Sequence, residues 1–159
     1  YTHTSLTNGT TYYYRVCATD TAGNISSGTT TSGTPQAPQP TTLASGLNGP
    51  KQIAVDSTNV YWTESSFVKK VGINGGTVTT LTPDPNSPVA IAIDSTNVYF
   101  TDSLGSGSVE KVSINGGLVT TLASLSSGAP TDIAVDSNSV YWTEYSGGTV
   151  NKVSINAAQ

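Results

Sequence analysis

One pattern of hydrophobic and polar residues occurs three times in this 159-residue chain. Each copy begins with three apolar residues, continues through a polar turn that starts with Asp, and ends in Val-Tyr-aromatic-Thr followed by Glu or Asp. The copies span residues 53–64, 91–102 and 133–144. Their first aspartates lie 38 and 42 residues apart, and three lysines further along recur at intervals of 41 residues. A structural repeat therefore organises most of the chain.

Each repeat predicts four β-strands. The first is apolar on both faces, as expected of a strand between neighbouring sheets, and the third alternates apolar and polar residues with the period of two of a strand. Asn-Gly-Gly at 74–76 and 115–117 predicts type I′ hairpin turns, because Asn and Gly accept the positive φ that these turns require. The expected strands are 53–55, 60–63, 68–73 and 78–81 in the first copy, 91–93, 98–101, 109–114 and 119–122 in the second, and 133–135, 140–143 and 150–155 in the third.

A period near 40 residues that is built of strands alone predicts the blades of a β-propeller. The two ends of the repeat region complement each other. Residues 41–44 have the sequence of a fourth strand without a blade before it, and the third copy lacks a fourth strand because Ala157 and Ala158 replace the turn glycines. We therefore predict that 41–44 form an outer strand that closes the last blade and leaves no free sheet edge.

Three blades are fewer than the roughly four to eight blades of known propellers. Two alternatives follow. The three blades are half of a six-bladed ring whose remainder lies outside this sequence, or two chains pair as a homodimer and exchange outer strands to complete six blades.

Residues 1–34 have a different pattern. Apolar and polar residues alternate over 12–18 between two clusters of turn residues, which predicts a strand, a turn and a second strand. The residues that carry a resemblance to the last two strands of a fibronectin type III domain are Leu6, Gly9, Tyr12, Val16 and Ala18. The resemblance implies that the Tyr12 hydroxyl hydrogen-bonds to nearby backbone and that the first strands of the sandwich lie upstream.

Residues 35–42 contain three prolines and no hydrophobic pattern, which is typical of an extended linker. The expected domains are thus a fibronectin-like fragment over 1–34, a linker over 35–42, and three blades with an amino-terminal outer strand over 43–159. The predicted fold class is all-β: three β-propeller blades, forming a partial or dimer-completed six-bladed propeller, after a truncated fibronectin type III sandwich fragment.

The Tyr-Trp-Thr-Glu/Asp segment, preceded by Ile-Ala-Val-Asp, resembles the YWTD repeat of six-bladed propellers in the low-density lipoprotein receptor family. The resemblance covers residues 43–156. It departs from the family pattern where two copies end in Glu and the second has Phe100 in place of Trp, and the growth-factor-like modules of receptor propellers are absent from this sequence. The combination with a fibronectin-like segment is also similar to bacterial cell-surface proteins.

The composition narrows the function classes. A net charge of −4 and a pI near 4.6 argue against nucleic acid and anionic membrane as partners, since both need a basic surface. Cys17 is the only cysteine, so neither an internal disulfide nor a cysteine-based zinc site is expected. No apolar run is long enough to insert in a membrane. The chain starts at Tyr1 without Met, which with the fibronectin-like fragment predicts a piece of a longer secreted protein.

The residues that the repeat sets in equivalent positions are expected to be structural. The aspartates after the first strand should cap the turn, and the aromatic residues should pack between blades; a platform for sugars is the alternative for the aromatic residues, and metal binding is the alternative for the aspartates. The repeated lysines are expected to blunt sheet edges or to form cross-strand charge pairs. The residues of this structural set are Asp56, Asp94, Asp136, Tyr61, Tyr99, Tyr141, Trp62, Phe100, Trp142 and, in the first segment, Tyr12.

Ligands of propellers usually bind at the channel mouth, on the face that carries the connections from the fourth to the first strand and from the second to the third. These connections differ between the copies, as binding loops on a rigid scaffold often do. The acidic residues there are expected either to form an acidic collar or to make hydrogen bonds between blades. The candidate ligand-binding residues are Asn48, Lys51, Glu64, Asp102, Glu144 and Tyr145.

The favoured function is a non-catalytic extracellular or cell-surface binding or adhesion module, with an unidentified extracellular protein or glycan as partner and without a cofactor or metal. One alternative is a fragment of a metal-dependent lactonase or of a streptogramin-lyase-type propeller enzyme. The lyases use a histidine, and the only histidine here, His3, lies outside the repeats. Another alternative is a purely structural surface repeat.

Overall fold

The computed structural model describes residues 2–82, 87–126 and 129–157, and the regular structure in these ranges is β-strand throughout. The predicted all-β class is therefore confirmed. The chain divides into two compact units, Tyr1–Thr41 and Thr42–Gln159.

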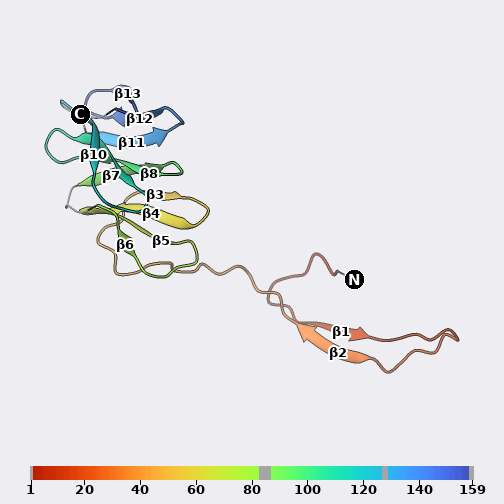
Figure 1. Cartoon of the computed structure of the whole chain (residues 1–159). Helices are drawn as coiled ribbons and strands as arrows, with labels where there is room; N and C mark the ends of the chain where they lie inside the picture. The colour runs from red at the N-terminus through yellow and green to blue at the C-terminus, as the bar shows by residue number, and fades with distance from the viewer. Residues whose placement is uncertain (1, 83–86, 127–128, 158–159) are drawn as a thin grey trace. The chain divides into compact units, whose positions relative to one another are not determined.

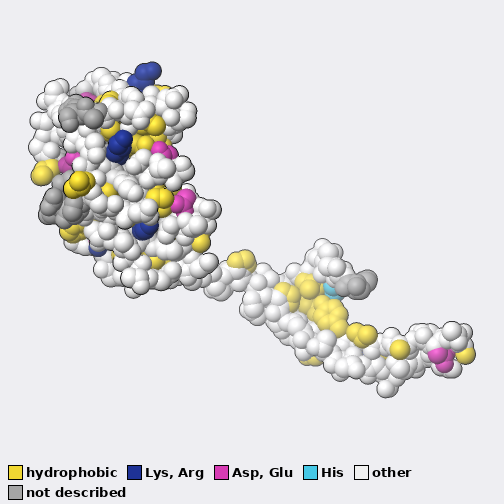
Figure 2. Space-filling model, viewed as in Figure 1, with side chains coloured by type: hydrophobic (Ala, Val, Ile, Leu, Met, Phe, Trp, Pro, Cys, Tyr) yellow, Lys and Arg dark blue, Asp and Glu magenta, His cyan; other side chains and the backbone are white. Residues whose placement is uncertain are grey.

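The first unit is a two-stranded hairpin that buries little. Strand β1 (Tyr12–Val16) pairs antiparallel with β2 (Thr29–Gly33). The Tyr12 hydroxyl accepts a hydrogen bond of 2.9 Å from the Thr7 backbone N–H, which is the kind of contact that the fibronectin resemblance implies. Hydrophobic side chains nevertheless remain on the surface of this unit (Figure 2), with Tyr13 and Val16 82% and 72% exposed.

The second unit consists of three antiparallel sheets that succeed one another along the chain (Figure 1). They are the three predicted blades. Blade 1 is formed by β3 (Ile53–Val55), β4 (Asn59–Glu64), β5 (Phe67–Gly72) and β6 (Thr79–Thr80). Blade 2 is formed by β7 (Pro88–Ile93), β8 (Asn97–Asp102), β9 (Ser108–Ser113) and β10 (Thr120–Ser124). Blade 3 is formed by β11 (Pro130–Val135), β12 (Ser139–Glu144) and β13 (Thr149–Ser154).

The register between the second and third strands is the same in every blade. The repeated tyrosine lies opposite the repeated lysine: Tyr61 opposite Lys70, Tyr99 opposite Lys111, and Tyr141 opposite Lys152. Because side chains alternate along a strand, this register also fixes which residues face the previous blade and which face the next.

The core lies between the blades. Between blades 1 and 2, one hydrophobic cluster contains Tyr61, Val68 and Leu81 on one side and Ile91, Val98, Phe100 and Val112 on the other. Between blades 2 and 3, the corresponding cluster contains Ala90, Tyr99, Val109, Leu122 and Leu125 on one side and Ile133, Val140 and Trp142 on the other. Tyr61, Tyr99, Phe100 and Trp142 are thus packed between neighbouring blades, whereas Trp62 packs with Leu43 and Ala44 on the outer side of blade 1, and Tyr141 of blade 3 is only half-buried.

The repeated lysines join the blades. Lys70 donates a hydrogen bond of 2.7 Å to the carbonyl of Ile114 in blade 2, and Lys111 donates one of 2.6 Å to the carbonyl of Ile155 in blade 3. The expectation of edge-blunting or cross-strand charge pairs is therefore wrong for these two residues. Their cross-strand neighbour is a tyrosine, and the long side chain reaches past it to the next sheet.

Two further details differ from the sequence-based expectation. Residues 41–44 form no strand. The sequence predicts that they pair with the last strand of blade 3, but Leu43 and Ala44 pack on blade 1 instead. The turns at 74–76 and 115–117 are not of type I′. Positive φ occurs at both glycines of each turn and not at the asparagine, so the glycines alone supply the left-handed conformation.

The third hairpin turn starts as the other two do. Ala157 donates to the carbonyl of Ser154, in the way that Gly75 donates to Gly72 and Gly116 to Ser113. Ala157, one of the two alanines predicted to prevent this hairpin, does not adopt the positive φ of Gly75 and Gly116. Ala158, the other one, lies outside the described residues.

The lysine contacts give a testable expectation. Lys111→Met keeps the apolar stem but removes the donor to the Ile155 carbonyl, and we expect it to lower the free energy of unfolding by about 1.5–3 kcal/mol, the range for hydrogen bonds to charged groups. Urea denaturation of the full chain measures this. Leu118→Ala, at a side chain that is 89% exposed, is the control and should change stability by less than about 0.5 kcal/mol. Equal effects of the two variants would contradict a role for Lys111 in joining the blades.

Candidate binding surface at the loop end of the blades

The two kinds of connection singled out in the sequence lie side by side at one end of each blade. In every blade, the residue after the second strand donates its backbone N–H to the connection that precedes the first strand. The three bonds are Ser65 to Asn48 at 3.0 Å, Ser103 to Ser87 at 3.1 Å, and Tyr145 to Ala129 at 3.1 Å. We call this surface the loop end. The described residues that compose it are 45–51, 64–66, 87, 102–107, 124–126, 129 and 144–148.

Two of the candidate ligand-binding residues, Asn48 and Lys51, make hydrogen bonds within the protein, Asn48 through its backbone carbonyl and Lys51 through its ammonium group. The Asn48 carbonyl accepts from both the N–H and the hydroxyl of Ser65, while its own side chain is exposed. Lys51 donates a 2.8 Å hydrogen bond to the Pro88 carbonyl of blade 2, so its ammonium joins two blades. Of these two residues, Asn48 has its side chain free to meet solvent.

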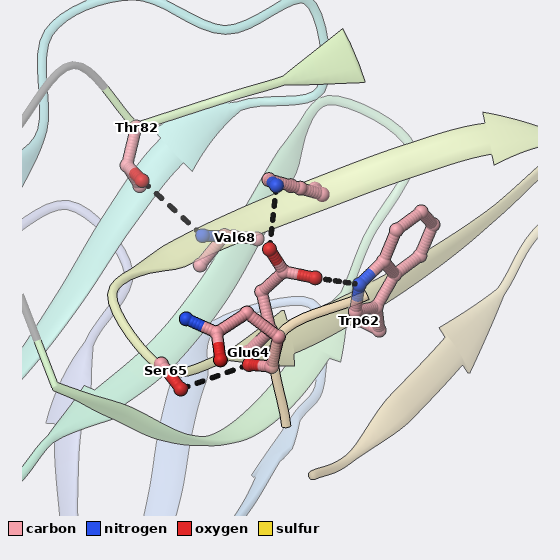
Figure 3. Close-up of polar contacts among 7 residues, drawn as sticks. Trp62, Glu64, Ser65, Val68 and Thr82 are labelled. Atoms are coloured by element: carbon pink, nitrogen blue, oxygen red, sulfur yellow. Dashed lines mark hydrogen bonds and ion pairs between the residues drawn. The ribbon is translucent and has the colours of Figure 1, made fainter. Parts of the chain in front are cut away.

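Glu64 is buried, with 2% of its surface exposed, and its carboxylate is used within its own blade. The Trp62 ring N–H donates to it at 3.0 Å and the Lys69 ammonium lies 2.5 Å away (Figure 3). Burial by itself would raise the pKa of Glu64, but the hydrogen bonds from Lys69 and Trp62 outweigh it and lower the pKa. The side chain is therefore an ionised structural anchor.

The second copy replaces this arrangement in a coordinated way. Phe100 has no N–H to donate, and the residue opposite it on β9 is Glu110 where blade 1 has Lys69. The acidic residue is here the shorter Asp102, which is 3% exposed and accepts from the backbone N–H groups of Ser87 at 2.7 Å and Leu104 at 2.5 Å. The change from Trp to Phe thus accompanies a change in what the carboxylate binds.

The third copy returns to the first arrangement in a more exposed setting. Glu144 is half-buried and accepts from the Trp142 ring N–H at 2.8 Å and from the Asn151 amide at 3.1 Å. The three acidic residues are therefore engaged within their own blades, and these contacts support neither an acidic collar nor the expected hydrogen bonds between blades.

The aspartates that follow the first strand form a clamp with the repeated tyrosine. Asp56 accepts from the backbone N–H groups of Thr58 and Asn59 at 2.6 and 2.7 Å, and the Tyr61 hydroxyl donates to its other oxygen at 2.8 Å. The corresponding clamps are Asp94 with Thr96, Asn97 and Tyr99, and Asp136 with Asn138, Ser139 and Tyr141. Each aspartate thus holds a turn and a tyrosine at the end opposite the loop end.

These clamps shift the titration of both partners. The Thr58 N–H, followed by the other hydrogen bonds, lowers the pKa of Asp56 to about 2 against the opposing effect of burial. Burial, together with the bond to Asp56, raises the pKa of Tyr61 to about 12. Burial and the bond to Asp94 raise the pKa of Tyr99 to about 12 as well. The tyrosine hydroxyl remains a donor and the carboxylate an acceptor over the ordinary pH range.

Two large hydrophobic side chains are exposed among the otherwise mostly polar exposed residues of the loop end. Tyr145 of blade 3 is 83% exposed, and Leu104, in the equivalent connection of blade 2, is 67% exposed. Sequence reasoning found Tyr145 but missed Leu104, because the connections do not repeat and a single leucine in a polar loop carries no pattern. An alignment of the three copies on their shared acidic residue does place both side chains in one connection.

No group of three or more His, Cys, Asp and Glu side chains in the described ranges is arranged to hold a metal ion. The described residues also contain no helix with the length and hydrophobicity to span a bilayer.

Comparison with known proteins supports the fold. Neither a protein-family model nor a curated relative matches the chain. Similar solved structures include one from a nidogen–laminin complex, with a TM-score of 0.55 and 20% identity, and a catalytically inactive virginiamycin B lyase from Staphylococcus aureus with quinupristin, with a TM-score of 0.52 and 13% identity. Both are propeller structures, and together with the three sheets they confirm the predicted fold class of β-propeller blades.

These likenesses concern the fold, because the identities are low. The nidogen–laminin alignment covers 69% of this chain and 44% of that one, and the lyase alignment covers 92% of this chain and 61% of that one. The chain thus spans about half the length of the structures that it resembles.

The lowered pKa values of the clamp aspartates predict a loss of stability in acid. A carboxylate whose pKa is depressed by folding contributes stability above its unfolded pKa, and this contribution disappears as the pH falls toward the folded value. For Asp56 that window runs from the ordinary value of 3.8 down to about 2. Thermal melts at a series of pH values should show the melting temperature falling across this window. Asp56→Asn should be less stable at neutral pH and show a shallower fall; an unchanged slope would contradict the assignment.

The difference between the acidic residues predicts unequal effects of the same substitution. Glu64→Gln removes the charge that pairs with Lys69 in a buried setting and should cost about 1.5–3 kcal/mol. Glu144→Gln, half-buried and paired with neutral donors, should cost about 0.5–1.5 kcal/mol. Urea denaturation compares the two, and a double-mutant cycle of Glu64→Gln with Lys69→Met should recover part of the loss. A larger effect at Glu144 would overturn this description.

Proposed function

We propose that this chain is a non-catalytic binding or adhesion module of an extracellular or cell-surface protein, and that its propeller blades hold a recognition surface at the loop end. The observation that carries the proposal is the exposure of Leu104 and Tyr145 in equivalent connections of neighbouring blades. Large apolar side chains presented together on a rigid scaffold favour contact with a partner, and tyrosine is enriched in such surfaces.

The composition supports an uncharged or weakly charged partner surface. Only 10% of the residues are charged, and the acidic side chains of the loop end are engaged in internal hydrogen bonds. Exposed Asn48 adds an amide that can donate to and accept from a polar group. Stacking on a tyrosine ring and hydrogen bonding to an amide suit either a protein surface or a glycan, in line with the expected class of partner.

The similar structures fit a binding role without assigning one. One of them comes from a complex of nidogen with laminin. The other is a lyase made inactive by replacement of a histidine. In this chain the only histidine, His3, belongs to the first unit and contacts the Tyr14 hydroxyl at 3.1 Å. The binding role is therefore preferred to an enzymatic one.

The test is binding of the purified full chain to an array of glycans and extracellular-matrix proteins. We expect one class of probe to be retained, and the double variant Leu104→Ser/Tyr145→Ser to weaken that binding by about tenfold or more, the effect of losing a central contact. Leu118→Ser is the matched control, since Leu118 is 89% exposed but follows the turn at the opposite end of blade 2.

Two results would overturn the proposal. Binding that the loop-end variant leaves unchanged would place the partner elsewhere, and the absence of binding to every probe would favour a purely structural repeat. Thermal stabilisation by Ca²⁺, Mg²⁺ or Zn²⁺ would instead favour the metal-dependent enzyme alternative, because a ligand that binds the folded state raises its stability.

A further inference from the structure

Each blade has two different faces, and the internal contacts show how they fit. The leading face carries the repeated Tyr, the Val at the start of the third strand and the Leu of the fourth strand. The receiving face carries the Ile of the first strand and the Val and Trp or Phe of the second. In this chain the leading faces of blades 1 and 2 are covered by the receiving faces of blades 2 and 3. The leading face of blade 3 and the receiving face of blade 1 have no blade against them among the described residues.

Exposure along the repeat shows that the leading face of blade 3 is open. Val150 is 77% exposed, whereas Val68 and Val109 at the same register positions are 0% exposed. A hollow of about 220 Å³ lies there, lined in part by Ala134, Tyr141 and Val150. The face therefore has the shape and apolar character of an unfilled blade contact.

Lys152 marks the same face. At the equivalent positions, Lys70 and Lys111 donate to an isoleucine carbonyl of the following blade. In the part of the chain that the structure describes, the Lys152 side chain is exposed and its ammonium donates to no carbonyl of another blade; its positive charge interacts with the Asp136 carboxylate of its own blade. The carbonyl that corresponds to Ile114 and Ile155 on blade 1 is that of Ile73, whose side chain is 41% exposed. The open face of blade 3 thus carries a donor, the Lys152 ammonium, and blade 1 carries the corresponding acceptor, the Ile73 carbonyl.

The receiving face of blade 1 is only partly covered. Ile53 is 71% exposed, whereas Ile91 and Ile133 at the same positions are 6% and 8% exposed. A hollow of about 430 Å³ is lined in part by Leu43, Ile53 and Trp62. Its volume leaves room for side chains from a neighbouring blade.

The receiving face of blade 1 is partly covered by residues 42–44, whose sequence matches the fourth strand of the other blades. Leu43 packs with Val60, Trp62 and Val71, just as Leu81 packs on blade 2. Thr42 and Leu43 match the Thr-Leu pairs 80–81 and 121–122 of the complete blades. In those blades the threonine lies opposite Lys69 or Glu110 of the third strand. The corresponding residue in blade 3 is Asn151, on the edge strand β13, beside which no further strand lies among the described residues.

We infer that blade 3 of one chain packs on blade 1 of a second copy, so that two chains close a six-bladed ring. Residues 42–44 of each chain supply the missing fourth strand of the other chain's blade 3, with Thr42 opposite Asn151. Lys152 of each chain donates to the Ile73 carbonyl of the other. The occupant of both open faces is therefore the same chain.

The inference follows from continuity with the contacts already present. If blade 1 of the second copy packs on blade 3 of the first copy as neighbouring blades pack within one chain, the second copy takes the place of blades four to six. The two copies are then related by a twofold axis, and the ring closes without a free sheet edge. A ring of six blades lies within the range of about four to eight that propellers use, whereas three four-stranded blades do not make one. The proposal does not depend on the loop-end ligand, because the two faces lie between blades.

The first experiment measures molar mass by light scattering after gel filtration of the full chain, over a range of protein concentrations. We expect a dimer. Val150→Asp should give a monomer that keeps its β-sheet circular dichroism, because the side chain is already exposed in the single chain but would bury a charge in the contact. Leu104→Asp, at an exposed loop residue away from both faces, is the control and should remain dimeric.

The second experiment tests the register. In a Cys17→Ser background, Thr42→Cys and Asn151→Cys are combined, since directly opposed residues on antiparallel strands are close enough for a disulfide. Oxidation should yield a covalent dimer on a non-reducing gel, and each single cysteine variant should not give the doubly linked species. A monomeric wild-type chain, an open-ended ladder of oligomers, a Val150→Asp variant that stays dimeric, or a disulfide formed within one chain would each overturn the inference.

Discussion

A blade of this protein has an apolar residue on each face of nearly every strand, and this makes a single blade unable to bury its own surface. Consecutive residues of a strand point to opposite faces, so Tyr99 and Phe100 can both be 0% exposed only if sheets lie on both sides of blade 2. The other features of the second unit follow from that constraint. The lysines that reach the next blade, the tyrosine clamps and the short polar connections all occur where one blade must fit the next.

Burying tyrosine rather than phenylalanine between blades requires a partner for its hydroxyl group. The clamp aspartate provides that partner and at the same time holds the turn that starts the second strand. The same residue therefore couples a local turn to the packing between sheets. This explains why Asp and Tyr occur together in every copy, although they lie five positions apart in the sequence.

The sequence predicts what depends on local pattern. Alternation and turn residues place the strands to within a few residues, and the repeat period gives the propeller. The fourth strand of blade 1 is shorter than predicted, with only Thr79–Thr80 paired, and the asparagine turns take another conformation because two adjacent glycines are available. The role of Lys70 could not be read from the sequence, since its acceptor, the Ile114 carbonyl, is 44 residues away and any residue has a carbonyl. The partners of Glu64 were also missed, although the change of Trp to Phe together with Glu to Asp in the second copy was the signal for them.

The coordinated change in the second copy has a consequence for how such repeats diverge. In the first copy Glu64 accepts the hydrogen bond of the buried Trp62 ring N–H, and in the second copy Phe100 has no N–H that needs an acceptor. A blade with Trp and Asp would leave the buried ring N–H without an acceptor, and a blade with Phe and Glu would remove one of the donors to a buried carboxylate. The aromatic and the acidic position must therefore change together, whereas the facing residue of the third strand differs even between the two copies that keep Trp and Glu, with Lys69 in the first and Asn151 in the third. Recombination that exchanges entire blades preserves both residues at once, whereas exchange within a blade can separate them. The hydrogen bond between Trp62 and Glu64 (Figure 3) thus favours exchange of intact blades over exchange of parts of a blade.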